Sequence, residues 1–234
     1  MTDPRTAELA DNLAVTRERI GAACEAAGRP ADAVTLIVVT KFFGADDVRR
    51  LPALGVTDVG ENRAQEALAK HAECADLDLI WHFIGQLQTN KAKSVVGYAD
   101  LVHTVDRPGL ATALGKAASV IDKRQQVLIQ VNLDPEPRAG RGGALPSEVP
   151  ELTQLVIDDP ALDLRGVMGV APLGEDPRPA FDRLAQISAA MRAEDPAADL
   201  ISAGMSSDLE AAIEYGATHL RVGAAVMGSR PTVR

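Results

Sequence analysis

The sequence predicts an α/β fold, namely a single (β/α)8 barrel of the TIM type with an extra helix at its N-terminus. Two observations lead to this prediction. Short apolar runs rich in β-branched residues recur along the chain, and segments with helical spacing of apolar residues separate them. This alternation is typical of parallel strands joined by helical crossovers, and eight such units can close into a barrel without an exposed edge. An open, doubly wound sheet is the alternative.

The first element expected is an amphipathic helix near the N-terminus. Leu9, Leu13, Ile20 and Cys24 recur at helical spacing and therefore share one face. Gly28 follows them as a residue that commonly ends a helix.

Strands and helices then alternate in a regular order. The expected strands cover 34–40, 56–60, 79–85, 100–104, 126–132, 163–169, 199–204 and 218–222. The expected helices lie between them, at 45–54, 62–75, 88–97, 107–122, 147–158, 177–193 and 208–215. No linker-like stretch interrupts this order, so we expect one domain over 1–234, with the helix of 1–30 packed on a barrel formed by 31–230.

Composition and charge limit the classes of function. The chain has 234 residues and a formal net charge of −9, and its basic residues are scattered among acids. Nucleic-acid binders usually carry a basic patch, so a nucleic-acid partner is not expected. The N-terminus lacks the apolar core of a signal peptide, and no apolar run reaches the length of a membrane span. We therefore expect a cytoplasmic protein without a membrane partner.

The stretch TLIVVTKFFG, residues 35–44, ends an apolar strand in a lysine, Lys41. The functional face of such a barrel lies at the carboxyl ends of its strands, so Lys41 can rise into the barrel mouth. Burial penalises the charged form of a lysine, and the neutral amine is a nucleophile that condenses with an aldehyde as a Schiff base. On position alone, a solvated lysine at the start of a loop is the better interpretation.

Two stretches near the C-terminus, 201–210 and 218–230, each end a strand with small residues. Free N–H groups at a helix start bind anions, and the loops after the seventh and eighth strands are the usual phosphate position in such barrels. Tight turns explain either stretch taken alone. The candidate phosphate ligands are Ser206, Ser207, Gly223 and Ala224.

Arg221 lies within the eighth apolar strand, two residues before Gly223. Strand alternation aims its side chain into the barrel if its neighbours face the helices. A buried guanidinium needs an acceptor, which an internal carboxylate or a ligand could supply. Lys41, a phosphate site and Arg221 together fit a phosphorylated aromatic aldehyde such as pyridoxal 5′-phosphate (PLP).

The sequence also resembles the pyridoxal phosphate homeostasis protein family, the YggS-type PLP-binding proteins. The matching motifs span nearly the whole chain in family order. They are VVTK (38–41), VGENRAQE (59–66), WHFIGQLQTNK (81–91), HTVDR (103–107), LRGVMG (164–169), GMSSDLEAAI (204–213) and RVGAAVMGSR (221–230).

The resemblance implies a barrel similar to the N-terminal domain of alanine racemase, with PLP held as a Schiff base on Lys41. It also implies that Ser206 and the main chain of Gly223 and Ala224 hold the phosphate, and that Arg221 faces the pyridine nitrogen. An arginine there keeps the nitrogen unprotonated, which makes the ring a weaker electron sink. Ser207 and Asn62 are secondary candidates for cofactor contact, and for Asn62 a cap on the following helix is the favoured interpretation.

The function expected from this resemblance is non-catalytic PLP homeostasis. The protein would buffer PLP and supply it to apo forms of PLP-dependent enzymes, as a monomer or weak dimer. We see no room before the chain ends at Arg234 for the second domain that supplies another base in alanine racemase-like enzymes. A small PLP enzyme such as an amino-acid racemase is the first alternative. A barrel that binds a sugar phosphate or nucleotide, with Lys41 as a countercharge, is the second.

The chain departs from the family pattern at three places. Ala224 stands where many members carry threonine, so we expect one hydroxyl contact to the phosphate to be missing. Phe42 and Phe43 replace residues that are often more polar. The Pro- and Gly-rich loop at 133–146 is a candidate lid, although a plain loop is the favoured interpretation.

Overall fold

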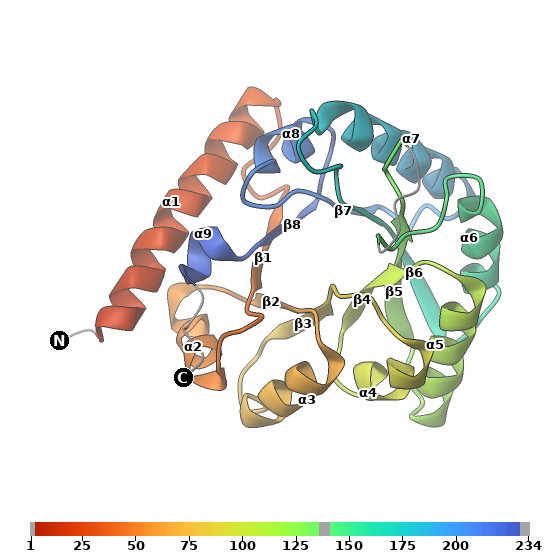
Figure 1. The fold of residues 1–234 in the computed structure, drawn as a ribbon, viewed down its shortest axis with the longest axis horizontal. Coiled ribbons are helices and arrows are strands. Elements are labelled where there is room, and N and C mark those ends of the chain that lie inside the picture. Colours follow the sequence, from red (N-terminus) through yellow and green to blue (C-terminus); the bar gives the residue numbers. More distant parts are fainter. Residues whose placement is uncertain (1–2, 136–140, 230–234) are drawn as a thin grey trace.

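The computed structural model describes residues 3–135 and 141–229 and shows a closed parallel barrel (Figure 1). Its strands follow one another around the barrel in chain order, and β8 returns to pair with β1, where Leu36 lies opposite Leu220. The predicted barrel is therefore confirmed, and the open sheet is wrong. The strands are β1 (Thr35–Val39), β2 (Asp58–Glu61), β3 (Ile80–Phe83), β4 (Leu101–Val105), β5 (Gln125–Val131), β6 (Leu162–Gly169), β7 (Leu200–Ser202) and β8 (His219–Val222).

Helices surround the strands on the outside, as Figure 1 shows. Among the described residues, none of these helices is both long and apolar enough to cross a bilayer. They are α1 (Pro4–Ala26), α2 (Ala45–Arg50), α3 (Ala64–Glu73), α4 (Ala92–Val96), α5 (Pro108–Val120), α6 (Val149–Ile157), α7 (Arg178–Glu194), α8 (Leu209–Glu214) and α9 (Ala224–Met227), with 3-10 turns η1 (Pro52–Leu54) and η2 (Thr89–Lys91).

Two of the expected helices are shorter than the sequence pattern suggested. The helix expected at 45–54 breaks after Arg50 into α2 and η1, because Pro52 lacks the N–H that would continue it and Gly55 adopts a left-handed conformation with φ 72°. The helix expected at 88–97 likewise divides into η2 and α4. These are differences of boundary, and the order of elements is as predicted.

The barrel wall separates two environments. Residues that point outward, such as Val38, Trp81 and Val167, join one large apolar core with the surrounding helices. The inside holds a small apolar cluster of Leu101, Leu128 and Met168. It also holds buried polar side chains from several strands, namely His82, His103, Gln130, Ser202 and Arg221. Arg221, a residue of the candidate site, belongs to this polar interior.

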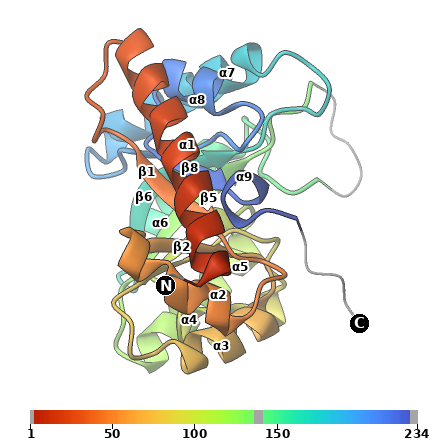
Figure 2. The ribbon, with the colours of Figure 1, turned by 90° about the vertical axis from the view of Figure 1, so that its left-hand side faces the viewer.

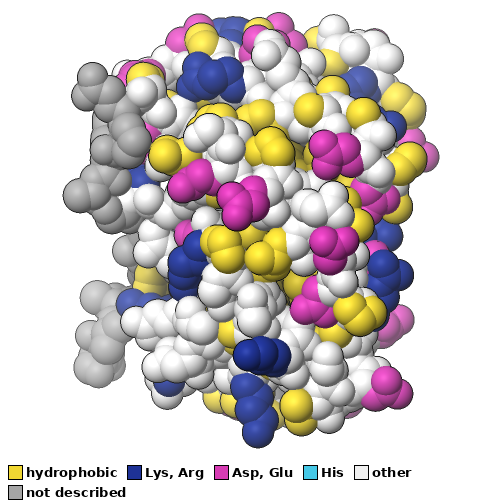
Figure 3. Space-filling view, turned by 90° about the vertical axis from the view of Figure 1, so that its right-hand side faces the viewer, with side chains coloured by type: hydrophobic (Ala, Val, Ile, Leu, Met, Phe, Trp, Pro, Cys, Tyr) yellow, Lys and Arg dark blue, Asp and Glu magenta, His cyan; other side chains and the backbone are white. Residues whose placement is uncertain are grey.

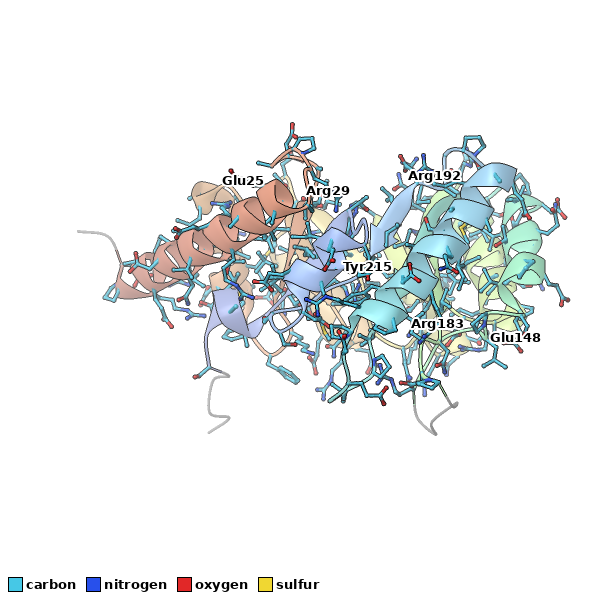
Figure 4. All side chains as sticks on the ribbon, turned by 90° about the horizontal axis from the view of Figure 1, so that it is seen from above. Glu25, Arg29, Glu148, Arg183, Arg192 and Tyr215 are labelled. Atoms are coloured by element: carbon cyan, nitrogen blue, oxygen red, sulfur yellow. The ribbon has the colours of Figure 1, made fainter. Side chains whose placement is uncertain are left out.

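The N-terminal helix α1 lies against the barrel beside α8 and α9 (Figure 2). Polar contacts hold it within the helix and just beyond its C-terminal end. Asn12 donates to the carbonyl of Val226 at 3.0 Å, and Arg29 donates to the carbonyl of Ile213 at 2.8 Å. Figure 4 shows Arg29 at the end of α1 that adjoins α8.

The surface over α5, α6 and α7 carries interspersed charges. Figure 3 shows acidic, basic and apolar side chains mixed on this face, with the basic side chains scattered. Such a surface does not present the basic patch that a polyanion would require.

Candidate functional site

Lys41 stands two residues after the end of β1, at the carboxyl-end face of the barrel, as the sequence predicted. Its side chain is half-buried, and Nζ lies 5.9 Å from the centroid of the Phe42 ring. The apolar strand before it buries Ile37 and Val38 completely, so both faces of β1 are covered there. The amine therefore projects at the mouth from a strand that is packed on both sides.

Phe42 adopts an uncommon backbone conformation beside Lys41. Its φ is 73°, a left-handed value that costs a bulky side chain of this kind energy. The half-exposed ring also lies 5.5 Å from the guanidinium of Arg63, so one aromatic ring adjoins two cations. Phe43, in contrast, turns into the core and is 7% exposed. Strain of this sort is often retained where it positions a functional neighbour.

A buried ion pair lies against the end of β1, and the sequence pattern did not predict it. Lys70 on α3 contacts the carboxylate of Glu61 on β2, and its Nζ donates to the main-chain carbonyl of Thr40 at 2.9 Å. Thr40 Oγ1 donates to Glu61 Oε1 at 2.6 Å. The available signal was that Lys70 lies one turn from Ala67, on the buried face of α3. The pair holds the peptide unit that leads into Lys41.

Arg221 is directed into the barrel, as strand alternation predicted, and is 5% exposed. Its Nη1 donates to Ser202 Oγ at 2.7 Å, and its Nη2 donates to the carbonyl of Gly169 at 2.9 Å. Burial lowers the pKa of Arg221 to about 10, so the guanidinium stays charged at neutral pH. These acceptors are neutral oxygens rather than the internal carboxylate considered from the sequence. A guanidinium carries five N–H donors, so others remain to face a ligand.

The chain after β7 runs beside β8. The N–H of Arg221 donates to the carbonyl of Gly204 at 3.0 Å, which places the following residues next to the end of β8. Gly204 has φ 92°, and a Cβ there would lie 2.6 Å from the Cβ of Ala212, so the turn requires glycine. Ser206 in this turn is half-buried, whereas Ser207 is exposed.

Gly223, one of the candidate phosphate ligands, lies next to β1, the strand that leads to Lys41. A Cβ at Gly223 would lie 3.4 Å from the Cβ of Val39, two residues before Lys41. Ala224 follows as an exposed residue and begins α9, whose first N–H groups have no acceptor within the helix. The structure therefore brings Lys41, Gly223 and Ala224 to adjacent strand ends, with Arg221 one level deeper.

Asn62 lies between β2 and α3 and does not cap the helix. Arg63 occupies the capping position of α3 and makes no capping hydrogen bond, so the helix-cap interpretation of Asn62 is wrong. The Asn62 Oδ1 atom is buried without a hydrogen-bond partner among the described residues. Asn62 lines a pocket of about 620 Å³ at the mouth, together with Lys91 and Arg107. Lys41 lies outside the described lining of that pocket.

The loop at 133–146 is held firmly where it is described. The N–H of Asn132 donates to the carbonyl of Ala144 at 2.8 Å, and Arg141 donates to the carbonyl of Val170 at 3.1 Å. From the other side, Arg183 on α7, labelled in Figure 4, donates to the carbonyl of Leu133 at 2.6 Å. The segment 136–140, on which a lid role would depend, lies outside the described residues.

The chain is a parallel barrel with a lysine amine after its first strand and a buried arginine on its last strand. Comparison with known proteins identifies the class to which such a barrel belongs. The family model for the N-terminal domain of alanine racemase matches residues 7–231. The pyridoxal phosphate homeostasis protein of Mycobacterium tuberculosis is 42% identical over 243 residues, covering 97% of this chain and 94% of that protein. The chain belongs to the pyridoxal phosphate homeostasis protein family.

Solved structures agree with this assignment. A protein of unknown function from Bifidobacterium adolescentis has a TM-score of 0.89 with 29% identity and covers 97% of each chain. PipY of Synechococcus elongatus, solved with PLP bound, has a TM-score of 0.80 with 35% identity. That likeness covers 94% of this chain and all of PipY, 100% of its length.

Proposed function

We propose that this protein binds PLP and holds it as a Schiff base on Lys41. The observation that carries the proposal is the position of the Lys41 amine, half-buried at the end of β1 and next to the strand end that bears Gly223. A phosphorylated aldehyde needs an amine and an anion site within one molecule's length, and these strand ends provide both. The PLP bound to PipY and the names of the curated relatives support the same ligand.

Each remaining residue has a distinct part in this proposal. Ser206 and the main chain of Gly223 and Ala224 bind the phosphate, with Ser207 at its exposed edge.

Bound PLP supplies an electron-withdrawing ring, whose strength as an electron sink depends on protonation of its nitrogen. The charged guanidinium of Arg221 faces that nitrogen and disfavours its protonation, because two like charges repel. Asn62 Oδ1, which is buried and unpaired among described residues, offers an acceptor at the rim.

The role we propose is PLP homeostasis rather than turnover. A Schiff base forms reversibly, so a protein that holds PLP this way buffers the free aldehyde and can release it to apo forms of PLP-dependent enzymes. Arg221 supports this role because an unprotonated ring stabilises carbanions poorly. The names of the curated relatives, which refer to homeostasis, point in the same direction.

A racemase activity is the second candidate, because the family model is named for alanine racemase. Racemisation would exchange the α-proton of an amino acid with solvent. Incubating the PLP-loaded protein with L-alanine in deuterated water measures that exchange directly. Exchange at a rate well above that of free PLP would support catalysis as the function in place of homeostasis.

Borohydride trapping tests the binding proposal. Reduction of the PLP-treated protein fixes a Schiff base as a stable secondary amine, which peptide mass analysis then locates. We expect the phosphopyridoxyl group on Lys41 and its loss in Lys41→Ala. Lys93→Ala, which removes an exposed amine on α4, serves as the matched control and should retain the adduct. In the wild type, an adduct on other lysines but not on Lys41, or no adduct at all, would refute the proposal.

A further inference from the structure

A row of polar side chains crosses the inside of the barrel and ends at Arg221. Asp58 Oδ1 lies 2.8 Å from His82 Nε2, and His82 Nδ1 lies 2.9 Å from His103 Nε2. His103 Nδ1 lies 2.9 Å from Ser202 Oγ, which accepts from Arg221 at 2.7 Å. Each of these side chains is buried, and they come from β2, β3, β4, β7 and β8. We call these five residues the interior polar row.

The donors in this row can be assigned from its two ends. Arg221 can only donate, so Ser202 Oγ accepts from it, and in the first of two possible directions the Ser202 hydroxyl gives its own proton to His103 Nδ1. Nδ1 of a neutral His103 is then bare, and its Nε2–H donates to His82 Nδ1. That leaves His82 with Nε2–H, which donates to the carboxylate of Asp58. All four hydrogen bonds run in one direction, and no nitrogen faces another acceptor.

The opposite direction is unfavourable at the Asp58 end. If His103 donated to Ser202, its bare Nε2 would require a donor on His82 Nδ1. A neutral His82 would then turn a bare nitrogen toward the Asp58 carboxylate, and two acceptors would meet. The only alternative is a doubly protonated His82, which would add a second cation to an interior that already holds the Arg221 guanidinium. His103 itself is neutral, because burial holds its pKa well below the usual value.

We propose that Asp58 is a positioning residue for Arg221, acting through His82, His103 and Ser202. The carboxylate selects the tautomer of both imidazoles, and these in turn aim the Ser202 oxygen at the guanidinium. The Gly169 carbonyl holds the other arm of Arg221, so its plane is fixed from two sides. Thr57 Oγ1 donates to Asp58 Oδ2 at 2.6 Å and keeps the carboxylate in place.

Other charged groups near the row leave this assignment unchanged. His219 lies with its ring centroid 6.2 Å from that of His82, and burial lowers the pKa of His219 to about 4, so it is neutral near pH 7. Asp199 and Arg165 act on His219 electrostatically with opposite signs. Asp208 acts on Arg221 through space, and its Oδ1 is occupied by the N–H of Met205 at 2.6 Å.

The first test uses the protein without PLP. Long-range proton–nitrogen NMR correlations distinguish the two neutral tautomers of histidine from its charged form. We expect His82 and His103 to be neutral with the proton on Nε2 at neutral pH. A charged His82, or a proton on Nδ1 of His103, would overturn the proposal.

Variants extend the test along the row. In Asp58→Leu the terminal acceptor is absent, so both tautomers should appear at His103, and the Arg221 side-chain signal should shift, although neither residue contacts position 58. Asp199→Leu, at an exposed acid near His219, is the control and should leave both signals unchanged. Asp58→Asn keeps an acceptor and should keep the wild-type tautomers. If Asp58→Leu does not fold, altered tautomers in Asp58→Asn would still contradict the proposal.

The consequence for PLP rests on the proposed function and is measured separately. With Arg221 less well aimed, we expect Asp58→Leu to bind PLP about tenfold more weakly than the wild type, the equivalent of part of one charged hydrogen bond. An unchanged affinity for PLP would show that Asp58 does not position Arg221 for ligand binding. A wild type that binds no PLP would refute the proposed function, whereas the tautomers would still decide the interior polar row.

Discussion

Lys70 donates a 2.9 Å hydrogen bond to the main-chain carbonyl of Thr40, the residue immediately before Lys41. The ammonium group of Lys70 is also paired with Glu61, and both side chains are almost fully buried. This contact links α3 and β2 to the strand end from which the candidate Schiff-base lysine projects. The peptide unit that leads into Lys41 is therefore held by an ion pair that is almost fully buried.

Removing one member of this pair should destabilise the protein strongly. In Lys70→Met the Glu61 carboxylate would be buried without its counter-ion, which typically costs about 3–5 kcal/mol. Urea unfolding measures this as a lower free energy of unfolding. The double variant Lys70→Met/Glu61→Gln removes the orphaned charge and should be more stable than Lys70→Met.

Lys116→Met on the exposed face of α5 is the control for this comparison, and it should change the free energy of unfolding by less than about 0.5 kcal/mol. An equal loss in Lys70→Met and in the control would show that the buried pair contributes nothing measurable.

Stability should fall as the pH falls below the ordinary pKa of histidine. Burial lowers the pKa of His219 from 6.5 to about 4. Between these values the unfolded chain binds a proton that the folded protein does not, so acidification favours unfolding. For His219 alone the loss between about pH 7 and pH 5 is about 2 kcal/mol. His103, whose pKa burial also lowers, adds to the loss in the same direction.

Urea unfolding at a series of pH values across this range checks the prediction. His219→Gln removes one titrating group and should flatten the decline by about 2 kcal/mol relative to the wild type. The Asp58 carboxylate does not interfere, because hydrogen bonds from His82 and Thr57 outweigh burial and leave its pKa below the usual value. A wild-type stability that stays constant down to pH 5 would contradict the buried, neutral state of His219.

The alanine at position 224 should limit the affinity for PLP. A threonine there would add a hydroxyl beside the proposed phosphate site, and a hydrogen bond of this kind is worth about 0.5–1.5 kcal/mol. We therefore expect Ala224→Thr to bind PLP about fivefold more tightly, as measured by equilibrium titration. Ala224→Val has the same shape without the hydroxyl and should not gain affinity. Equal gains in both variants would assign the effect to packing rather than to the hydroxyl.

Most of the barrel could be predicted from the sequence because its strands are buried on both faces. Runs such as 36–39 are apolar throughout, and their regular alternation with helical segments leaves few ways to arrange them. Lys41 could be placed at the mouth for the same reason, since the apolar run ends at Val39, two residues before it. Helix ends were less predictable, as at α2, where Pro52 and Gly55 end the helix early.

The contacts within the site could not be predicted in this way. A period of two residues states that Arg221 points inward, but it does not state that Ser202 and Gly169 receive its hydrogen bonds. Nor does it state that Lys70, from a surrounding helix, reaches the carbonyl of Thr40. Such neighbours depend on the stagger between strands, which is set only when the sheet closes.

The amino-acid sequence by itself determined the order of elements, the inward direction of Arg221 and the position of Lys41 at a strand end. These follow from local periodicity and from where apolar runs stop. Only the tertiary structure decided that Asp58 and Arg221 are joined through three intervening side chains, and that Glu61 and Lys70 underlie Lys41. The reason is physical: barrel closure brings residues from distant strands within hydrogen-bonding distance, and no local pattern encodes that register.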